Sequence, residues 1–452
     1  MQGMTDCIEY SVRPCFLTDN NSILKGARYM KTLKELKSFI ILWLTQSFSA
    51  LGSGMTNFAL VIWIYNRTGS ATQTALLTVC SYAPYVIMSI FAGAISDKWN
   101  KKTIMLICDS IAAICTISVF LLIKTDMLQI WHLYILNAVN GLMNTVQSPA
   151  SDVATTLLTP KKHYQKTSGM RSFSNSLVSI LTPVFATALV SFAGIETVIL
   201  FDLVTFATAF IVLLLFIRIP KSEKNDNKKD PIWKSAKSGL LYLKQNKGIL
   251  WMILFLSAIN LIASFYNAAL PAMVLSKSDE TSLGMVTATV GIATLVGSVM
   301  ATVYPKPKNR MKVICNCLLI SMSTENFLLA LGNNTFLWCL GAVLGWLFIP
   351  LMSANYDVLF KTNVPVEMQG RVYSARNTLQ FFTIPLGYFL GGFLVDNVFE
   401  PFMAGLDKEN LLIFVFGEDK GSGAALLFFI MGIAGVLVCL IFRRIKALYT
   451  LE

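Results

Sequence analysis

The feature that most constrains this chain is a succession of long apolar segments. Twelve can be marked, each long enough to cross a hydrocarbon layer of roughly 30 Å at about 1.5 Å of rise per helical residue. They lie at 38–64, 72–95, 103–123, 131–157, 172–192, 197–217, 249–275, 283–304, 312–331, 336–360, 374–396 and 422–442. Only 14% of the 452 residues are charged, too few to cover a water-facing surface. The sequence therefore predicts an all-α integral membrane protein with twelve transmembrane helices.

The net charge of +12 is concentrated on one side of the predicted membrane. If the N-terminus is cytoplasmic, the inside loops carry most of the lysine and arginine, with nine such residues between 218 and 248. The outside loops carry few, namely Arg67, Lys124, Lys277, Lys408 and Lys420. Because basic residues are retained on the cytoplasmic side, this distribution predicts that both termini are cytoplasmic. It explains the basic excess without nucleic acid, and we expect no nucleic-acid binding.

The apolar segments divide the chain into two halves and three polar stretches. These are a cytoplasmic tail at 1–37, an N-terminal six-helix bundle at 38–217, a cytoplasmic basic linker at 218–248, a C-terminal six-helix bundle at 249–445 and a cytoplasmic tail at 446–452. In the linker, apolar residues at helical spacing after Trp233 predict an amphipathic helix on the inner membrane face. The first tail lacks the apolar core of a signal peptide. Met30 opens a basic amphipathic lead-in, so we expect that translation begins there and that 1–29 are not translated.

An internal repeat relates the two halves. Each half has an aspartate, a proline eight residues later and an arginine eleven residues after that, at the predicted cytoplasmic end of an even-numbered helix. The members are Asp152, Pro160 and Arg171 in the first half and Asp357, Pro365 and Arg376 in the second. Two six-helix halves joined by a basic linker follow the parallel-repeat plan of facilitator transporters.

The loop after the second apolar segment carries a further motif. Its residues are Gly93, Asp97, Lys98, Asn100, Lys101 and Lys102. This set resembles the loop signature of the major facilitator superfamily, with Asn100 in place of the usual glycine. Physically, Gly93 allows close helix approach, and Asp97 can accept hydrogen bonds from amides at a neighbouring helix N-terminus. The alternative interpretation is an ordinary basic loop.

Three more stretches match a narrower pattern. They are Trp43 to Leu60, Thr68-Gly69-Ser70-Ala71, and Gly370-Arg371 with Ser374. They resemble macrolide-efflux-type permeases, a drug:proton antiporter branch of the same superfamily. The resemblance covers nearly the whole chain from Met30. It implies a facilitator fold and export driven by the proton gradient, and it leaves the substrate open.

The resemblance also implies a conformational latch at the cytoplasmic face, a charge network that favours the outward-facing state. The candidate members, including the repeat partners, are Gly93, Asp97, Lys98, Lys101, Lys102, Asp152, Arg171, Asp357 and Arg376. The alternative is that these residues only anchor the topology. The chain departs from the drug-antiporter pattern at Asn137, where an arginine is frequent, and at Thr182, where a glycine often precedes the proline.

Polar residues form stripes on three of the predicted helices. The candidates for lining a cavity are Gln46, Ser49, Ser53 and Thr56 on the first helix, Asn137, Asn140 and Asn144 on the fourth, and Asn260, Ser264 and Asn267 on the seventh. Polar groups that faced lipid would lack partners, so these stripes should turn inward. In the resembled fold, helices 1, 4, 7 and 10 line the central cavity. The alternative is hydrogen bonding between helices, worth about 0.6 kcal/mol a pair.

Three acids lie inside predicted spans, where a charge costs roughly 2.5–3.5 kcal/mol and often marks function. Asp109, Asp202 and Glu325 are therefore candidates for a proton-coupling site, with Asp109 first. The resemblance places their helices at the periphery of the fold, so exposure to the central cavity is not expected. The alternative is that each is a hydrogen-bonded structural acid.

Other functions lack their signatures in this sequence. An ATP-driven pump would need a phosphate-binding glycine-rich loop, and His132 and His163 fall near opposite membrane faces, so they cannot share a catalytic site. We expect no enzyme activity, no metal and no cofactor. The partners expected are a small-molecule substrate, protons and the lipid bilayer, with the chain a monomer in the bacterial cell membrane. With the resemblance described above, these features predict an exporter of macrolide-like amphipathic drugs. The alternatives are export of a siderophore or lysolipid, and a non-transporting receptor.

Overall fold

The computed structural model describes residues 35–220 and 240–452, and all regular elements in this part of the chain are helices. The proposed start at Met30 lies outside the described residues, as does the linker from 221 to 239. The rest of the predicted amphipathic segment is described: residues 240–245 are helical, and Leu243 is buried. The first half consists of α2 (Lys37–Thr68), α3 (Ala71–Lys98), α4 (Lys101–Lys124), α5 (Ile130–Leu158), the short η1 (Lys161–His163) and α6 (Tyr164–Leu215). The first four expected apolar segments thus begin and end within a few residues of a helix, and α6 holds the fifth and sixth together.

The long helix α6 is two helices joined at Gly194, whose φ of 78° lies in the left-handed region that favours glycine. Before this turn, Thr182 packs against Gly54 of α2. After it, Asp202 packs against Gly52, two residues before Gly54. Both legs of α6 therefore lie beside the same level of α2 and run in opposite directions, as the sequence predicts for two successive spans.

The second half continues the same architecture. Its elements are α8 (Lys247–Lys277), α9 (Glu280–Val303), α10 (Arg310–Leu331), α11 (Thr335–Trp346), α12 (Ile349–Asn363), α13 (Val366–Phe381), α14 (Thr383–Leu394), the π-helix η2 (Val395–Phe399), α15 (Glu400–Ala404), α16 (Leu411–Phe416), α17 (Ser422–Arg443) and η3 (Lys446–Leu451). The tenth expected segment is divided between α11 and α12, and the eleventh between α13 and α14. In the described residues, nine helices or helix runs are long and apolar enough to cross a membrane.

Polar caps determine where several of these helices begin. A side-chain oxygen at the N-cap position accepts a backbone amide one turn into the helix at Asn100, Asp279, Asn309, Asn334 and Asn410. In the loop before α9, Asp279 accepts the Ser282 amide at 2.8 Å. This hydrogen bond to the charged form holds the pKa of the Asp279 carboxyl below its usual value.

The repeat is visible in how the helices cross. Gly141 of α5 lies against the carbonyl of Ser81 in α3, where a Cβ would come within 2.0 Å of that oxygen. In the second half, Gly297 of α9 lies equally close to the carbonyl of Leu347. The crossing of α3 and α5, the second and fourth spans, therefore matches the crossing of α9 with the segment between α11 and α12, the eighth and tenth spans. Glycine is needed at both crossings because any side chain would strike backbone.

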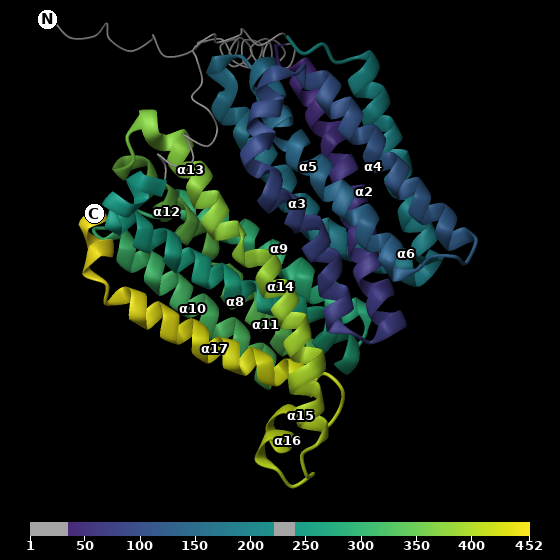
Figure 1. The fold of residues 1–452 in the computed structure, drawn as a ribbon, viewed down its shortest axis with the longest axis vertical. Coiled ribbons are helices and arrows are strands. Elements are labelled where there is room, and N and C mark those ends of the chain that lie inside the picture. Colours follow the sequence, from purple (N-terminus) through teal and green to yellow (C-terminus); the bar gives the residue numbers. More distant parts are fainter. Residues whose placement is uncertain (1–34, 221–239) are drawn as a thin grey trace, which may run out of the picture.

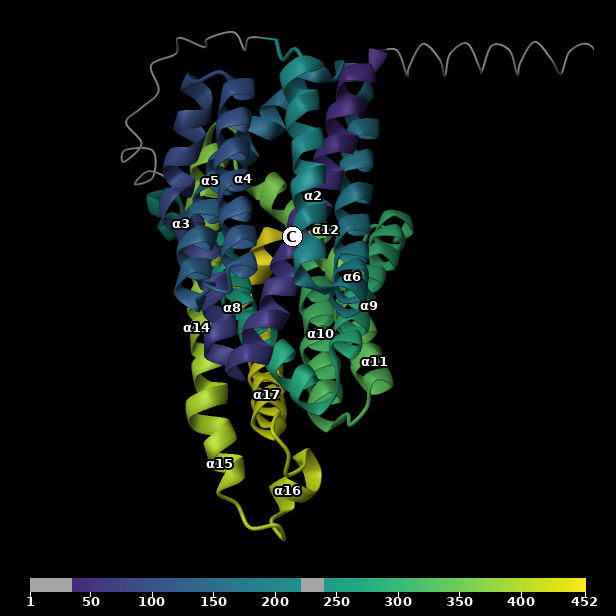
Figure 2. The same ribbon diagram turned by 90° about the vertical axis from the view of Figure 1, so that its right-hand side faces the viewer.

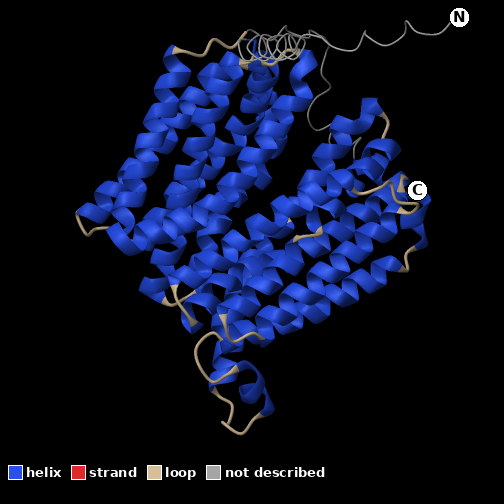
Figure 3. Cartoon of the chain, turned by 180° about the vertical axis from the view of Figure 1, so that it is seen from behind, coloured by secondary structure: helices blue, strands red, loops and turns tan. Residues whose placement is uncertain are grey.

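The two bundles approach each other at one end of the molecule and separate at the other. In Figure 1, the first half (purple to blue) and the second half (green to yellow) diverge toward the end where α2 begins. Figure 3 shows the same separation from behind. We call this the Lys37 end and the opposite one the Gly69 end. Beyond the Gly69 end, α15 and α16 project past the remaining helices (Figure 2).

The last residues of the chain, which the sequence predicts to be a cytoplasmic tail, pack against the second bundle. Leu448 and Leu451 are buried in the apolar core formed by α8, α10 and α12. The Glu452 carboxylate accepts the amides of Arg310 and Met311 at 3.1 and 2.6 Å, which satisfies the amino end of α10.

Candidate functional site

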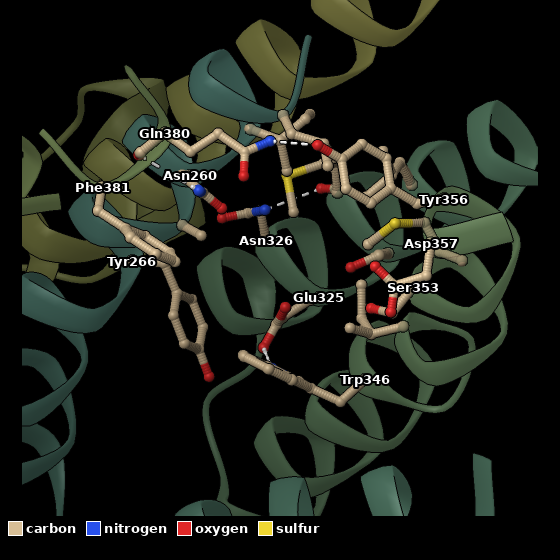
Figure 4. A pocket seen from close by; sticks show the side chains of 18 of the residues that line it. Asn260, Tyr266, Glu325, Asn326, Trp346, Ser353, Tyr356, Asp357, Gln380 and Phe381 are labelled. Atoms are coloured by element: carbon tan, nitrogen blue, oxygen red, sulfur yellow. Dashed lines mark hydrogen bonds between the residues drawn. The ribbon is translucent and has the colours of Figure 1, made fainter. Parts of the chain in front are cut away.

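The second half contains a cavity of about 350 Å³ between α8, α10, α11, α12 and α13. Most of its wall is apolar or aromatic, including Tyr266, Trp346, Tyr356 and Phe381. The polar groups are few and converge from different helices, as Figure 4 shows. A volume of this size and a wall of this character are typical of sites for small organic molecules.

Glu325 of α10 is the buried charge of this cavity, with 4% of its surface exposed. The Trp346 indole donates to its Oε1 at 2.6 Å. Gly345 allows the carboxyl to lie against α11, since a Cβ there would come within 2.6 Å of Oε2. The Tyr266 hydroxyl is buried without a hydrogen-bond partner and lies on the same side of the cavity (Figure 4). A buried carboxyl with a single strong donor can carry or release a proton inside the membrane.

The opposite wall of the cavity is a hydrogen-bonded set. Gln380 donates from Nε2 to the Tyr356 hydroxyl at 2.8 Å. Asn260, from the predicted stripe on helix 7, donates to the Gln380 carbonyl at 3.4 Å. The Arg376 guanidinium lies 5.9 Å from the Tyr356 ring centroid, within the range of a cation–π contact. These contacts fix a polar wall opposite Glu325.

The first half contains a smaller chamber of about 100 Å³ between α2, α4, α5 and α6. It gathers six of the residues singled out in the sequence: Ser53, Thr56, Asn137, Asn140, Asn144 and Asp202. Ser53 donates to Asp202 Oδ1 at 3.0 Å, and Asp202 is 3% exposed. Thr56 Oγ1 and Asn140 Oδ1 are buried without a hydrogen-bond partner. The polar stripes on helices 1 and 4 therefore face each other inside the first bundle.

The structure separates the three intramembrane acids. Asp202 and Glu325 each line a cavity of their own half, which the peripheral placement of their helices did not predict. Asp109 is buried outside both linings, where Gln147 donates to its Oδ1 at 2.6 Å. Of the predicted cavity-lining residues, four lie outside both cavities: Gln46, Ser49, Ser264 and Asn267. Ser264 instead donates to the Asn260 carbonyl and packs against Gly387.

The two bundles are joined at the Gly69 end by a carboxylate. Asp396 of η2 accepts the backbone amides of Ala71 and Thr72 at 2.9 and 2.8 Å. The Ser70 hydroxyl donates to the same carboxylate at 2.6 Å. Asp396 thus caps the amino end of α3, where the helix dipole favours a negative charge. Gly392 lies against the Thr72 backbone, so the end of α14 and the start of α3 approach closely.

Further cross-bundle contacts surround this carboxylate. The Tyr65 hydroxyl donates to the Ala272 carbonyl at 3.0 Å, Asn66 donates to Glu280 at 2.7 Å, and Lys420 donates to the Gly69 carbonyl at 2.7 Å. They involve α2 and its following turn in one half, and α8, α9 and the segment before α17 in the other. The Gly69 end is therefore closed between the halves.

At the Lys37 end, several predicted latch residues have contacts within the first half. Arg171 forms an ion pair with Asp152. Lys102 donates from Nζ to the carbonyls of Leu214 and Ile217 at 2.9 and 2.8 Å. Lys101 donates to the Trp99 carbonyl at 3.3 Å.

Two further latch candidates lie in the second half. Arg376 stacks on Phe360 and hydrogen-bonds to Asn377, and Asp357 is exposed at the edge of the Glu325 cavity. The side chains of Gly93, Asp97 and Lys98 lie outside the described part. The latch therefore stays a prediction.

Sequence reasoning missed the residues that complete the Glu325 cavity, namely Tyr266, Trp346, Tyr356 and Gln380. Aromatic residues are so frequent in the spans that periodicity could not select them. It also missed Asp396, which lies at the end of an apolar run and is paired with a turn more than 300 residues away. The Gly391-Gly392 pair before it was the available signal, because paired glycines in a span permit close backbone approach.

The fold and its cavities define a class of protein: an all-α, multi-pass membrane transporter of small molecules. The Major Facilitator Superfamily sequence profile matches residues 42–388, and the chain belongs to this superfamily. It is 24% identical over 367 residues to Macrolide efflux protein A of Streptococcus pyogenes, a match that covers 80% of this chain and 90% of the relative.

Two solved structures have the same fold. A point mutant of the nucleoside transporter NupG gives a TM-score of 0.68 at 15% identity and covers 90% of this chain and 99% of its own. A bacterial homologue of the human lysosomal transporter Spinster, in an inward-facing and occupied conformation, gives a TM-score of 0.66 at 15% identity. That match covers 90% of this chain and 96% of the homologue. The chain is thus a multi-pass protein of the bacterial plasma membrane with relatives that act in efflux.

Proposed function

We propose that this chain is a secondary active transporter that exports amphipathic, macrolide-like molecules by alternating access, in exchange for protons. The observation that carries the proposal is the cavity around Glu325: about 350 Å³, largely apolar and aromatic, with one buried carboxyl. Such a wall takes the apolar body of a ligand, and the few polar groups orient it. The relative named Macrolide efflux protein A supports macrolides as the first compounds to test.

The transport cycle follows from the difference between the two ends. With twelve spans and both termini cytoplasmic, the Lys37 end faces the cytoplasm, and the closed Gly69 end faces outward. The state described is then inward-facing. Export requires that the Asp396 contact break while the bundles close at the Lys37 end. The predicted latch around Asp97 would stabilise that second state.

Proton coupling is assigned to Glu325 in preference to Asp109. A carboxyl within the substrate cavity can exchange a proton for substrate directly, because both occupy the same space. In the outward-facing state Glu325 would bind a proton, and in the inward-facing state it would release that proton as substrate enters. Asp109 is hydrogen-bonded to Gln147 and lies outside the lining of the Glu325 cavity.

The test is uptake of macrolides and amphipathic dyes into inverted membrane vesicles energised by respiration. We expect accumulation of at least one compound, with loss of accumulation on addition of a proton uncoupler. Trp346→Ala should abolish it, whereas Glu409→Gln, an exposed acid of the outer segment, should not. If the correctly inserted protein accumulates none of the panel with or without a gradient, drug export is wrong, and siderophores and lysolipids become the next compounds to test.

A further inference from the structure

We propose that the chamber in the first half is a binding site for a monovalent hard cation, Na⁺, with Asp202 as its anionic ligand. This goes beyond the export proposal, because the site lies in the other bundle and its occupation can be measured without any substrate. The residues that would ligate the ion come from α2, α5 and the second leg of α6.

The first argument is charge. Asp202 is almost fully buried, and the part of the chain that the structure describes places no basic side chain in the chamber lining. A hydrogen bond from Ser53 does not neutralise a carboxylate. A buried charge without a counter-charge is strongly unfavourable, so Asp202 must bind either a proton or a cation. Because only one carboxylate is present, a monovalent ion gives neutrality and a divalent ion does not.

The second argument separates the cation from the proton. A proton satisfies one carboxylate oxygen and leaves its neighbours as they are. Here Thr56 Oγ1 and Asn140 Oδ1 are also buried without partners, and Thr56 is only 7% exposed. Carboxylate, amide and hydroxyl oxygens converging on one small space are the donor set that hard cations prefer. A cation would use all of these oxygens at once.

The third argument is size and position. A chamber of about 100 Å³ has room for an ion with one or two water molecules, since a water takes roughly 30 Å³. It is too small for a drug-sized ligand. Gly52 permits the close approach of α2 to the second leg of α6, where a Cβ would come within 2.9 Å of Asp202 Cα. The backbone thereby holds Asp202 beside Ser53.

The experiment is thermal unfolding of the purified full chain in NaCl, LiCl, KCl or choline chloride at constant ionic strength. We expect a saturable rise in the unfolding temperature with Na⁺ that choline does not produce, because a ligand of the folded state stabilises it. Asp202→Asn should abolish the rise. Asn140→Ala, which removes one neutral ligand and keeps the acid, should shift the half-saturating Na⁺ concentration upward about tenfold or more.

Asp109→Asn is the matched control, since it removes a buried acid outside the chamber and should keep the full Na⁺ response. Binding of radioactive Na⁺ to the same variants gives a second readout if one variant is poorly stable. The proposal is overturned if the wild type responds equally to Na⁺ and choline, or if Asp202→Asn retains the response. A stabilisation that follows pH and ignores Na⁺ would assign Asp202 to a proton. Failure of drug export would leave each of these outcomes unchanged.

Discussion

The two halves share a scaffold but have different cavities. The second half has about 350 Å³ lined by aromatic rings around Glu325, whereas the first has about 100 Å³ lined by amides and hydroxyls around Asp202. The glycine crossings at Gly141 and Gly297 show that the helices meet alike. The two cavities therefore differ in side-chain chemistry, which fits the proposals of an apolar ligand in the second half and a small ion in the first.

The buried acids of the two cavities also differ in their surroundings. The indole of Trp346 gives Glu325 one strong donor and a flat apolar neighbour, which suits a group that exchanges its proton beside a ligand. Ser53 gives Asp202 one weaker donor among oxygens that still lack partners. These surroundings fit the proposed contact of Glu325 with substrate and of Asp202 with an ion.

The largest expected effect tests the aromatic cavity. Trp346→Ala removes a ring from the wall and leaves Glu325 without its donor, so substrate affinity should fall on the order of 100-fold or more. Trp346→Phe keeps a ring and loses the donor, which should cost about 1.5–3 kcal/mol, roughly 10- to 100-fold. Equilibrium binding of an exported compound measures both. Phe336→Ala, which alters an exposed ring, is the control, and equal affinities for all three proteins would refute the assignment.

The next effect tests whether the shared scaffold is real. Gly141→Ala and Gly297→Ala each place a Cβ against a backbone carbonyl, and such overpacking typically costs about 1–3 kcal/mol. Both variants should lower the unfolding temperature by similar amounts. Gly169→Ala is the control, because nothing lies within 4 Å of its Cβ position, and it should be neutral or slightly stabilising. A harmless Gly141→Ala beside a harmful Gly297→Ala would break the equivalence of the halves.

A smaller effect concerns the contact between the halves. Asp396→Asn removes a charge from the amino end of α3, an interaction worth about 0.3–2 kcal/mol, so the population should move toward the outward-open state. Spin labels at Thr125→Cys and Asn333→Cys, exposed positions in the two halves, would report a longer distance component. Asp407→Asn, an exposed acid of the outer segment, should leave the distances unchanged. An unaltered distribution in Asp396→Asn would remove this contact from the gating account.

The smallest effect is a pH dependence at the Lys37 end of the first half. Glu35 accepts from Lys162 at 2.6 Å and lies 3.0 Å from His163, and these hydrogen bonds lower the pKa of the Glu35 carboxyl. A lowered folded-state pKa adds stability at pH values above the unfolded value of about 4.3, and this stability is lost as the pH falls through the folded value. Unfolding temperatures of the wild type and Glu35→Gln should therefore differ slightly near pH 7 and converge in acid. A constant difference at every pH would show that the pair is not responsible.

Much of the fold could be predicted because lipid imposes a simple rule on sequence. Each expected apolar segment coincides with a helix or a pair of helices, and the spacing of Asp152 and Asp357 indicated the repeat. The polar stripes on helices 1 and 4 could be found by periodicity because polar groups are rare in spans. The cavity that these stripes line could not be predicted, because Ser53 and Asp202 come together only when α6 turns back at Gly194.

The Glu325 cavity was beyond sequence reasoning for a similar reason. Its wall is made from abundant residue types on five helices, and only packing selects Trp346 and Tyr266 from the other aromatic residues. The contact of Asp396 with the amino end of α3 joins two segments that are far apart in the sequence, and no local pattern predicts it. The buried polar and acidic residues were therefore easier to predict than the residues that contact them.

The most direct test of the account compares Glu325→Gln with Asp109→Asn in proteoliposomes. For each, substrate counterflow measures binding and exchange, and uphill transport under an imposed proton gradient measures coupling. We predict that Glu325→Gln keeps counterflow within a few-fold of the wild type and loses uphill transport, whereas Asp109→Asn keeps both. Uphill transport that survives in Glu325→Gln and disappears in Asp109→Asn would contradict the account and place the coupling proton outside the cavity.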